Sequence, residues 1–218
     1  FDADNTAAVN QPVVQTHVPV YSCPSDQSQP GQIAIPRQGV ADVPGAKFQY
    51  SSYRGVQGRV DPPYFFTPDV HSWNTLRGSG NMPRSWRGIF HIVAPVEGLA
   101  RCESTASVTD GLSNTLAIGE RHQPMDQPTY GTFWGYARGC TSPVYPYSIS
   151  FDVLNFGECL RNSPSTKPCG YGAWGSYHVG ANNWLIADGS VRTISLNVNS
   201  QLMSQMAGIA DGDVTRLD

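Results

Sequence analysis

The segment HVGANNWLIADGS, residues 178–190, holds a histidine at an interval of nine residues from an Asp-Gly pair. An imidazole and a carboxylate can bind a metal ion or exchange protons with a substrate. The alternative is a plain hairpin, in which Asp188 and Gly189 form the turn and His178 is a hydrogen-bonded side chain. We favour the hairpin without a metal, because a lone histidine lacks the convergent partners that a metal site requires.

The pattern around Asp188-Gly189 predicts two adjacent antiparallel strands, residues 183–187 and 190–196. Asp-Gly suits a two-residue type I′ turn, in which both residues have positive φ. That register places Ile186 opposite Val191 and leaves apolar side chains on both faces, so we expect the hairpin to be central and at least partly covered on both sides. His178 is then expected to be mostly buried, with Asp188 as one candidate partner.

Other polar groups suggest turns more than active sites. Asp110, Gly111 and Asn114 predict a turn before a strand at Thr115–Glu120. Asp211 and Asp213 are oxygen-rich enough to be weak calcium candidates, but the segment lacks the ligand ladder of an EF-hand. The sequence contains no GxSxG, HExxH, GxxxxGK[ST] or GxGxxG motif, so we expect no enzyme activity and no cofactor other than that calcium alternative.

The cysteines indicate an oxidising compartment. None of the five forms CxxC or has zinc-finger spacing to histidine, which argues against a structural zinc site. Cys159 and Cys169 bracket a polar loop with two prolines, and a disulfide that closes so small a loop is typical of exported proteins. We therefore expect this disulfide and an extracytoplasmic location.

Composition favours short strands and long ordered loops. The 218 residues include 22 glycines and 17 prolines, and only 14% are charged, against about 25% in average soluble domains. With a net charge of −3, the chain has no excess of positive charge that would indicate binding to nucleic acid. No segment of the sequence reads as a membrane span or a signal peptide. We expect one domain over residues 1–218, with irregular insertions at about 56–100 and 123–175.

Few helices are expected within this α+β arrangement. The sequence predicts a short helix within residues 5–16, interrupted near Pro12, and strands at Val18–Ser22 and Lys47–Tyr53. The best helix candidate lies within residues 199–208, with Asn199 as its cap.

Four blocks occur in an order that resembles a known family: VPVYSCPSD, YSSYRGVQG, VTDGLSNTLAIGERH and HVGANNWLIADGSVRTIS. Together they resemble the planctomycete DUF1559 type IV pilin-like proteins, and His178, Asp188 and Gly189 fit that family's H-X9-DG motif. The resemblance implies a pilin-type headgroup built on an antiparallel sheet. It also implies a preceding hydrophobic helix, which we do not expect within residues 1–218. We therefore expect another chain, a self-associated copy or an upstream segment to cover an apolar face of the hairpin, with one of the long loops folding back over it as the main alternative. Cys23 is then the natural candidate for an unpaired thiol.

Three functions remain open from the sequence. We favour a non-enzymatic, pilin-like structural subunit at the cell surface or in the periplasm, with protein partners or self-association, no nucleic acid, and membrane contact only through the absent helix. Buried tryptophans and an open apolar face would support it. A carbohydrate- or ligand-binding module would instead show exposed aromatic side chains in one cleft. A hydrolase would show convergent titratable groups in a pocket.

Overall fold

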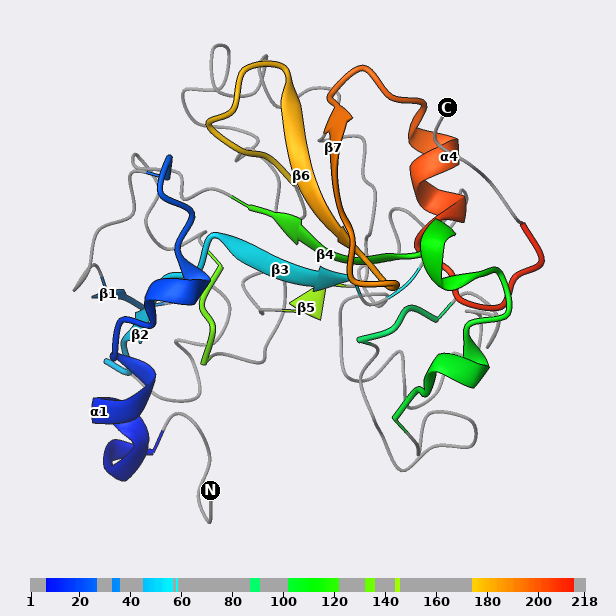
Figure 1. The fold of residues 1–218 in the computed structure, drawn as a ribbon. Helices are drawn as coiled ribbons and strands as arrows, with labels where there is room; N and C mark the ends of the chain where they lie inside the picture. The colour runs from blue at the N-terminus through cyan, green and yellow to red at the C-terminus, as the bar shows by residue number, and fades with distance from the viewer. Residues whose placement is uncertain are drawn as a thin grey trace, which may run out of the picture.

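A computed structural model gives the fold in Figure 1 and describes the following residues: 7–26, 33–35, 45–56, 58, 87–90, 102–121, 132–135, 144–145 and 174–213. Most of the two expected insertions lies outside the described residues, and so does the expected disulfide between Cys159 and Cys169. In the parts of the chain that are described, no helix combines the length and the apolar character needed to cross a bilayer.

A five-stranded sheet forms the framework, with the strand order β5-β3-β4-β6-β7. Its strands are β3 (Tyr53–Val56), β4 (Leu116–Glu120), β5 (Val144–Tyr145), β6 (Ala181–Ile186) and β7 (Val191–Ser195). All neighbours are antiparallel except β3 and β5, which run parallel. A second, two-stranded antiparallel sheet joins β1 (Ile33–Ala34) to β2 (Phe48–Gln49). The expected α+β fold with an antiparallel sheet is confirmed, and the stretch expected to be irregular after residue 123 contributes the edge strand β5.

The N-terminal segment is helical where a strand was expected. The 3-10 helix η1 (Ala8–Asn10) leads into α1 (Gln11–Val14), in agreement with the predicted short helix near Pro12. The strand predicted at Val18–Ser22 is wrong, because Pro19–Tyr21 form the 3-10 helix η2. Pro19 sits in the first turn, where its fixed φ suits a helix and its missing N–H costs nothing.

The strand predicted over Lys47–Tyr53 is divided into β2 and β3. Between them, Ser51 makes local hydrogen bonds: its Oγ donates to the Tyr53 carbonyl at 3.0 Å and accepts from the Tyr53 N–H at 3.2 Å. Serine side chains that bond to nearby backbone compete with the strand ladder, so the chain turns at this point.

The segments after residue 104 follow the predictions more closely. The 3-10 helices η6 (Thr105–Ser107) and η7 (Leu112–Asn114) precede β4, which begins one residue later than predicted. Helix α4 (Ser200–Gln205) has the expected N-cap, Asn199, whose side chain accepts a hydrogen bond from the Gln201 N–H at 2.8 Å.

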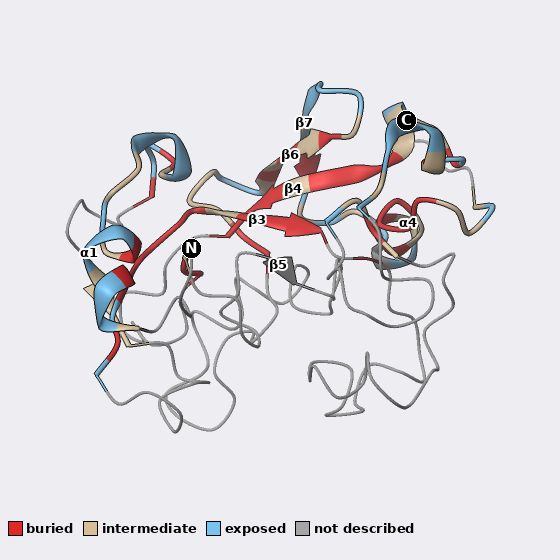
Figure 2. Ribbon diagram, turned by 90° about the horizontal axis from the view of Figure 1, so that it is seen from below, coloured by how far each residue is buried: buried red, intermediate tan, exposed pale blue. Residues whose placement is uncertain are grey.

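One face of the five-stranded sheet packs against α4 and carries the larger core cluster. Trp184 and Ile186 of β6 and Ile194 of β7 are buried against Met203 and Met206. In Figure 2 the buried residues run along β3 and β4 and reach α4. Side chains alternate along a strand, so the neighbours of these core residues project from the opposite face of the sheet.

The β6–β7 hairpin has a register one residue away from the prediction. Leu185, not Ile186, lies opposite Val191, and Trp184 lies opposite Arg192. β7 is an edge strand, and Val191 is 68% exposed. The expectation that the hairpin is central and at least partly covered on both sides holds for β6, an inner strand whose side chains are buried on the α4 face and intermediate on the other. It is wrong for the edge strand β7, which leaves its other face exposed.

The turn explains this shift. The Ile186 N–H donates to the Ser190 carbonyl at 2.8 Å, and the Gly189 N–H donates to the Ile186 carbonyl at 3.0 Å. Gly189 has φ of 90°, whereas no described residue other than glycine has positive φ. Asp188 therefore does not adopt the type I′ conformation. The loop has three residues and ends with a glycine in the left-handed region, which is the next most common hairpin connection.

Gly189 provides the first testable prediction. Replacing it with alanine should lower the free energy of unfolding by about 1 kcal/mol, because a side chain is strained at positive φ. The space around Gly189 is open, with no atom within 4 Å of an added Cβ, so backbone strain is the only expected cost. Urea denaturation measures the loss. Gly189→Asn is the matched variant and should lose less, since asparagine tolerates this conformation. Equal losses for both variants would contradict the interpretation.

Candidate functional site

Three side chains that can bind metal or exchange protons converge at one end of β6. His178 Nε2 lies 3.2 Å from Glu120 Oε1 and 3.8 Å from Cys23 Sγ. Cys23 Sγ lies 3.8 Å from the same carboxylate oxygen. The three atoms lie within 4.8 Å of one another, although Cys23 is 97 residues from Glu120 and 155 from His178 in the sequence.

The sheet places Glu120 on the face opposite the α4 core. Its neighbour Gly119 pairs with Trp184, which belongs to that core. The alternation of side chains therefore turns Glu120 to the other face, together with Tyr53, its partner on β3. Cys23 follows η2, and His178 lies in the turn that leads into β6. A loop, a strand end and a turn thus supply one side chain each.

The Glu120 carboxylate is held firmly in place. It is 3% exposed. Its Oε2 accepts the Asn183 backbone N–H at 2.7 Å, and its Oε1 accepts the Asn183 side-chain amide at 3.2 Å. These hydrogen bonds connect the end of β4 to β6 and leave Oε1 directed at His178 and Cys23.

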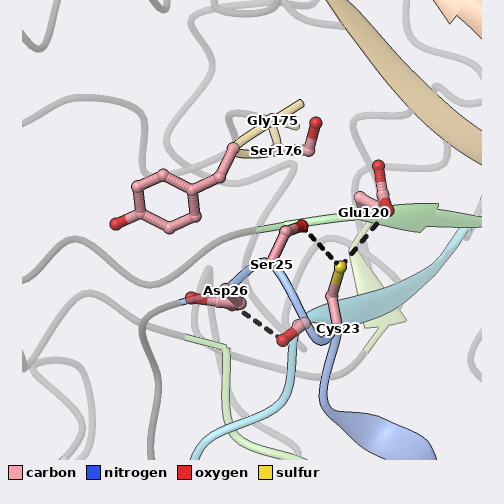
Figure 3. Close-up of a pocket in the computed structure, with 8 residues that line it drawn as sticks. Cys23, Ser25, Asp26, Glu120, Gly175 and Ser176 are labelled. Atoms are coloured by element: carbon pink, nitrogen blue, oxygen red, sulfur yellow. Dashed lines mark hydrogen bonds between the residues drawn. The ribbon is translucent and has the colours of Figure 1, made fainter. Parts of the chain in front are cut away.

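A small pocket opens beside the cluster (Figure 3). It encloses about 160 Å³, including space open to solvent, and its lining consists of Cys23, Ser25, Asp26, Ser52, Glu120, Gly175, Ser176 and Tyr177. Figure 3 shows the Cys23 thiol between Ser25 and Glu120, and the Sγ–Oγ distance to Ser25 is 3.0 Å. The Ser52 hydroxyl donates to Asp26 Oδ2 at 2.7 Å. Polar side chains therefore surround the thiol.

Acidic side chains lie close to the thiol. Burial, the contact with Cys23 and the nearby Glu120 and Asp26 carboxylates together raise the pKa of Tyr53 to about 12, and burial is the largest cause. Tyr53 is therefore a neutral hydrogen-bond donor at physiological pH. Two carboxylates and a thiol in one place would favour a bound cation.

The arrangement does not match a nucleophile–histidine–acid relay. In such a relay the acid bonds to one imidazole nitrogen, so that the other nitrogen can take the proton of the nucleophile. Here Cys23 and Glu120 both approach Nε2 of His178. Instead, one atom from each of the three side chains points to a common centre, as the ligand atoms of a metal site do. The argument for a metal-free His178, that it has no convergent partners, therefore does not hold.

The H-X9-DG spacing now has a structural explanation. His178 and Asp188 lie at opposite ends of β6, whose six residues span about 20 Å. Asp188 does not contact His178; its carboxylate accepts the Ser190 hydroxyl at 2.6 Å and the Ser190 N–H at 2.8 Å, and these bonds lower its pKa. His178 is partly buried, with 38% of its side chain exposed; its partner in the sheet is Glu120, and the suggestion of Asp188 as a partner is wrong.

The turn predicted at Asp110–Asn114 is bonded to the C-terminal part of the described chain. Gly111 has φ of 99°, and the Asn114 side chain donates to the Asp110 carbonyl at 3.3 Å. The buried Asp110 carboxylate accepts the backbone N–H groups of Asp211 and Gly212, at 2.8 and 3.1 Å. This structural role for Asp110 was not predicted.

The calcium candidates form a turn of their own. Asp211 Oδ1 accepts the Asp213 N–H at 3.0 Å, which is the local bonding typical of aspartate in turns. Calcium at Asp211 and Asp213 stays a weak alternative.

Sequence reasoning identified His178 but missed Cys23 and Glu120 as its partners. All three residues lie within the four quoted blocks, in VPVYSCPSD, AIGERH and HVGANN.

Among the described cysteines, Cys23 and Cys102 are free thiols, and Cys23 is the buried one. The disulfide between Cys159 and Cys169 stays a prediction, which non-reducing peptide mapping can test.

Comparison with known proteins yields one match. The family model described as a protein of unknown function (DUF1559) matches residues 1–201. No curated protein and no solved structure shows significant similarity to the chain.

Proposed function

Since this chain belongs to the DUF1559 family, whose model covers residues 1–201, we propose that it is a pilin-like structural subunit exposed at the cell surface or in the periplasm. The observation that carries the proposal is the order of the four sequence blocks, which resembles the pilin-like members of that family. The protein acts by presenting a folded surface to other protein chains, either copies of itself or components of a surface complex.

The positions of the described tryptophan side chains support a structural role for the protein. Trp174 and Trp184 are 0% and 1% exposed and contact each other in the core, with ring centroids 4.7 Å apart and ring planes tilted by 43°. Trp134 is half-buried, and its Nε1 donates to the Thr16 carbonyl at 3.1 Å while its ring tilts against Tyr21. These rings serve packing within the chain and do not line the pocket. Among described residues they therefore give no support to a sugar-binding function.

Exposed apolar side chains on the N-terminal segment favour contact with another protein. Val9, Val13, Val20 and Tyr21 are 73%, 44%, 74% and 42% exposed. Val9 and Val13 are four residues apart on consecutive helical turns, so they share a face. Figure 1 shows this segment at one side of the molecule, away from α4. Apolar groups that remain exposed in the isolated chain are candidates for burial in an interface.

Surface labelling in the native bacterium tests the proposal. Single cysteines at Val9 and Val179, which are 73% and 101% exposed, are introduced into the complete gene product on a Cys102→Ser background. A membrane-impermeant maleimide applied to intact cells should label Val179→Cys. Val9→Cys should be labelled less in cells than in the isolated chain, because an assembled partner covers the N-terminal segment.

The two sites separate location from assembly. If neither cysteine reacts until the cells are lysed, the extracytoplasmic location is wrong. If both react on cells as fast as in the isolated chain, the protein is exposed but the N-terminal segment is not an interface, which contradicts the structural role proposed here.

A further inference from the structure

We propose that Cys23, Glu120 and His178 bind a Zn²⁺ ion, with a fourth coordination position open to the adjacent pocket. This site goes beyond the proposed structural function, since a surface subunit needs no metal in order to assemble.

The spacing of the three ligand atoms fits tetrahedral zinc. At bond lengths of about 2.0 Å to nitrogen and oxygen and about 2.3 Å to sulfur, tetrahedral angles place nitrogen and oxygen about 3.3 Å apart and sulfur about 3.5 Å from either. The corresponding distances are 3.2 Å between His178 Nε2 and Glu120 Oε1, and 3.8 Å from Cys23 Sγ to each. An ion can therefore enter with adjustments of a few tenths of an ångström.

The types of ligand select zinc over other common cations. Calcium and magnesium prefer oxygen ligands alone, and Cys23 and His178 supply sulfur and nitrogen. Zinc accepts thiolate, imidazole and carboxylate together. One Zn²⁺ ion also neutralises the two negative charges that the Cys23 thiolate and the Glu120 carboxylate would carry beside a neutral imidazole.

Two of the ligands are held in position before any ion binds. Asn183 fixes the Glu120 carboxylate through its backbone N–H and its side-chain amide. Ser176 Oγ accepts the His178 backbone N–H at 3.1 Å and donates to the Ala181 carbonyl at 2.8 Å, which ties the turn to the start of β6. Supporting hydrogen bonds of this kind orient metal ligands and raise their affinity for the ion.

The fourth position faces solvent. His178 is 38% exposed, whereas Glu120 is 4% exposed in its side chain. The pocket lining includes Ser25, Ser176 and Tyr177, and Ser25 Oγ lies 3.5 Å from His178 Nε2 and 3.0 Å from Cys23 Sγ, so the Ser25 hydroxyl or a water can complete the coordination. Zinc sites with three protein ligands keep such an open position, whereas purely structural sites have four.

A bound ion would connect the N-terminal segment to the sheet. Cys23 lies just after η2, while Glu120 ends β4 and His178 precedes β6. Coordination would hold these segments together and stabilise the folded state, because an ion that binds only the folded chain shifts the unfolding equilibrium.

Cobalt provides the direct test, because Co²⁺ replaces zinc and reports its ligands by absorption. The reduced, metal-free chain is titrated with Co²⁺. We expect a thiolate-to-cobalt charge-transfer band and strong ligand-field bands, which reach a plateau at one equivalent and disappear when Zn²⁺ is added. Zn²⁺ should also raise the melting temperature, and removing it with a chelator should reverse the rise.

Variants assign these signals to the site. Cys23→Ser should abolish the charge-transfer band, and His178→Asn should weaken Zn²⁺ binding at least about tenfold. The matched controls are Cys102→Ser, which removes the exposed free thiol, and His17→Asn, which removes an imidazole bonded to Ser22. Both controls should bind Co²⁺ and Zn²⁺ like the original chain.

Two results would overturn the site. One is a reduced original chain that shows no charge-transfer band at one equivalent of Co²⁺. The other is a band that persists in Cys23→Ser, which would assign the sulfur ligand to another of the five cysteines. Circular dichroism verifies that each variant is folded, and the half-exposed His178 supplies the informative variant if a change at buried Cys23 prevents folding.

Discussion

Replacing Gly119 with alanine should destabilise the protein by about 3 kcal/mol, at the upper end of the usual range for overpacking a core. A Cβ at this position would lie 2.4 Å from Trp184 Cζ3 and 2.6 Å from Trp174 Cε3. Both rings are fully buried and packed against each other, so neither can move without displacing the core. Urea denaturation of the metal-free chain measures the loss.

Gly55 offers the matched control, because it is also a strand glycine. The three atoms nearest to a Cβ there all belong to the Phe90 side chain, the closest at 3.2 Å, and Phe90 is 40% exposed. That ring can move toward solvent, so Gly55→Ala should cost less than about 1 kcal/mol. If the two variants lose equal stability, the loss comes from the strand backbone, and the tight contact between Gly119 and the tryptophans is not its cause.

This contact also shows the limit of sequence reasoning. The strand from Leu116 to Glu120 could be predicted from its apolar run and the preceding turn, and so could helix α4 from its cap. The partner of Gly119 could not be predicted, because it depends on the exact pairing of β4 with β6 and on a bulge between Leu116 and Ile118. A shift of one residue in a strand moves every side chain to the other face.

The hairpin register illustrates the same point. Asp188-Gly189 predicted a turn correctly, but the type I′ and the three-residue connections share this dipeptide. They differ in whether Asp188 adopts positive φ, and its hydrogen bonds to Ser190 accompany the three-residue form. The wrong turn type shifted the register and led to the incorrect expectation that the second strand of the hairpin is also partly covered on both sides.

The candidate site was predicted only as far as His178. Its partners come from a loop 155 residues earlier and from the end of β4. Local spacing cannot predict that these segments meet, because no short motif joins them. The resemblance did include all three residues in its blocks, but it assigned a role only to the H-X9-DG residues. A fold was required to show that a thiol and a carboxylate lie against the imidazole.

Removing the Glu120 carboxylate should have the second large effect, a loss of about 3 kcal/mol in Glu120→Ala. Glu120 accepts hydrogen bonds from the backbone and the side-chain amide of Asn183. Without the carboxylate, both donors lose a charged acceptor, and hydrogen bonds to charged groups contribute more than neutral ones. Urea denaturation in the presence of a chelator isolates this contribution from any bound metal.

Two variants separate the structural role of Glu120 from metal binding. Glu120→Gln keeps an oxygen for the Asn183 N–H, so it should lose about half as much stability as Glu120→Ala. His178→Ala changes a half-exposed side chain and should lose less than about 1 kcal/mol in chelator. If Glu120→Ala unfolds at the same urea concentration as the original chain, the carboxylate does not hold β4 to β6. If His178→Ala loses as much as Glu120→Ala, the contact between Glu120 and His178, and not the bonds to Asn183, is what stabilises this end of the sheet.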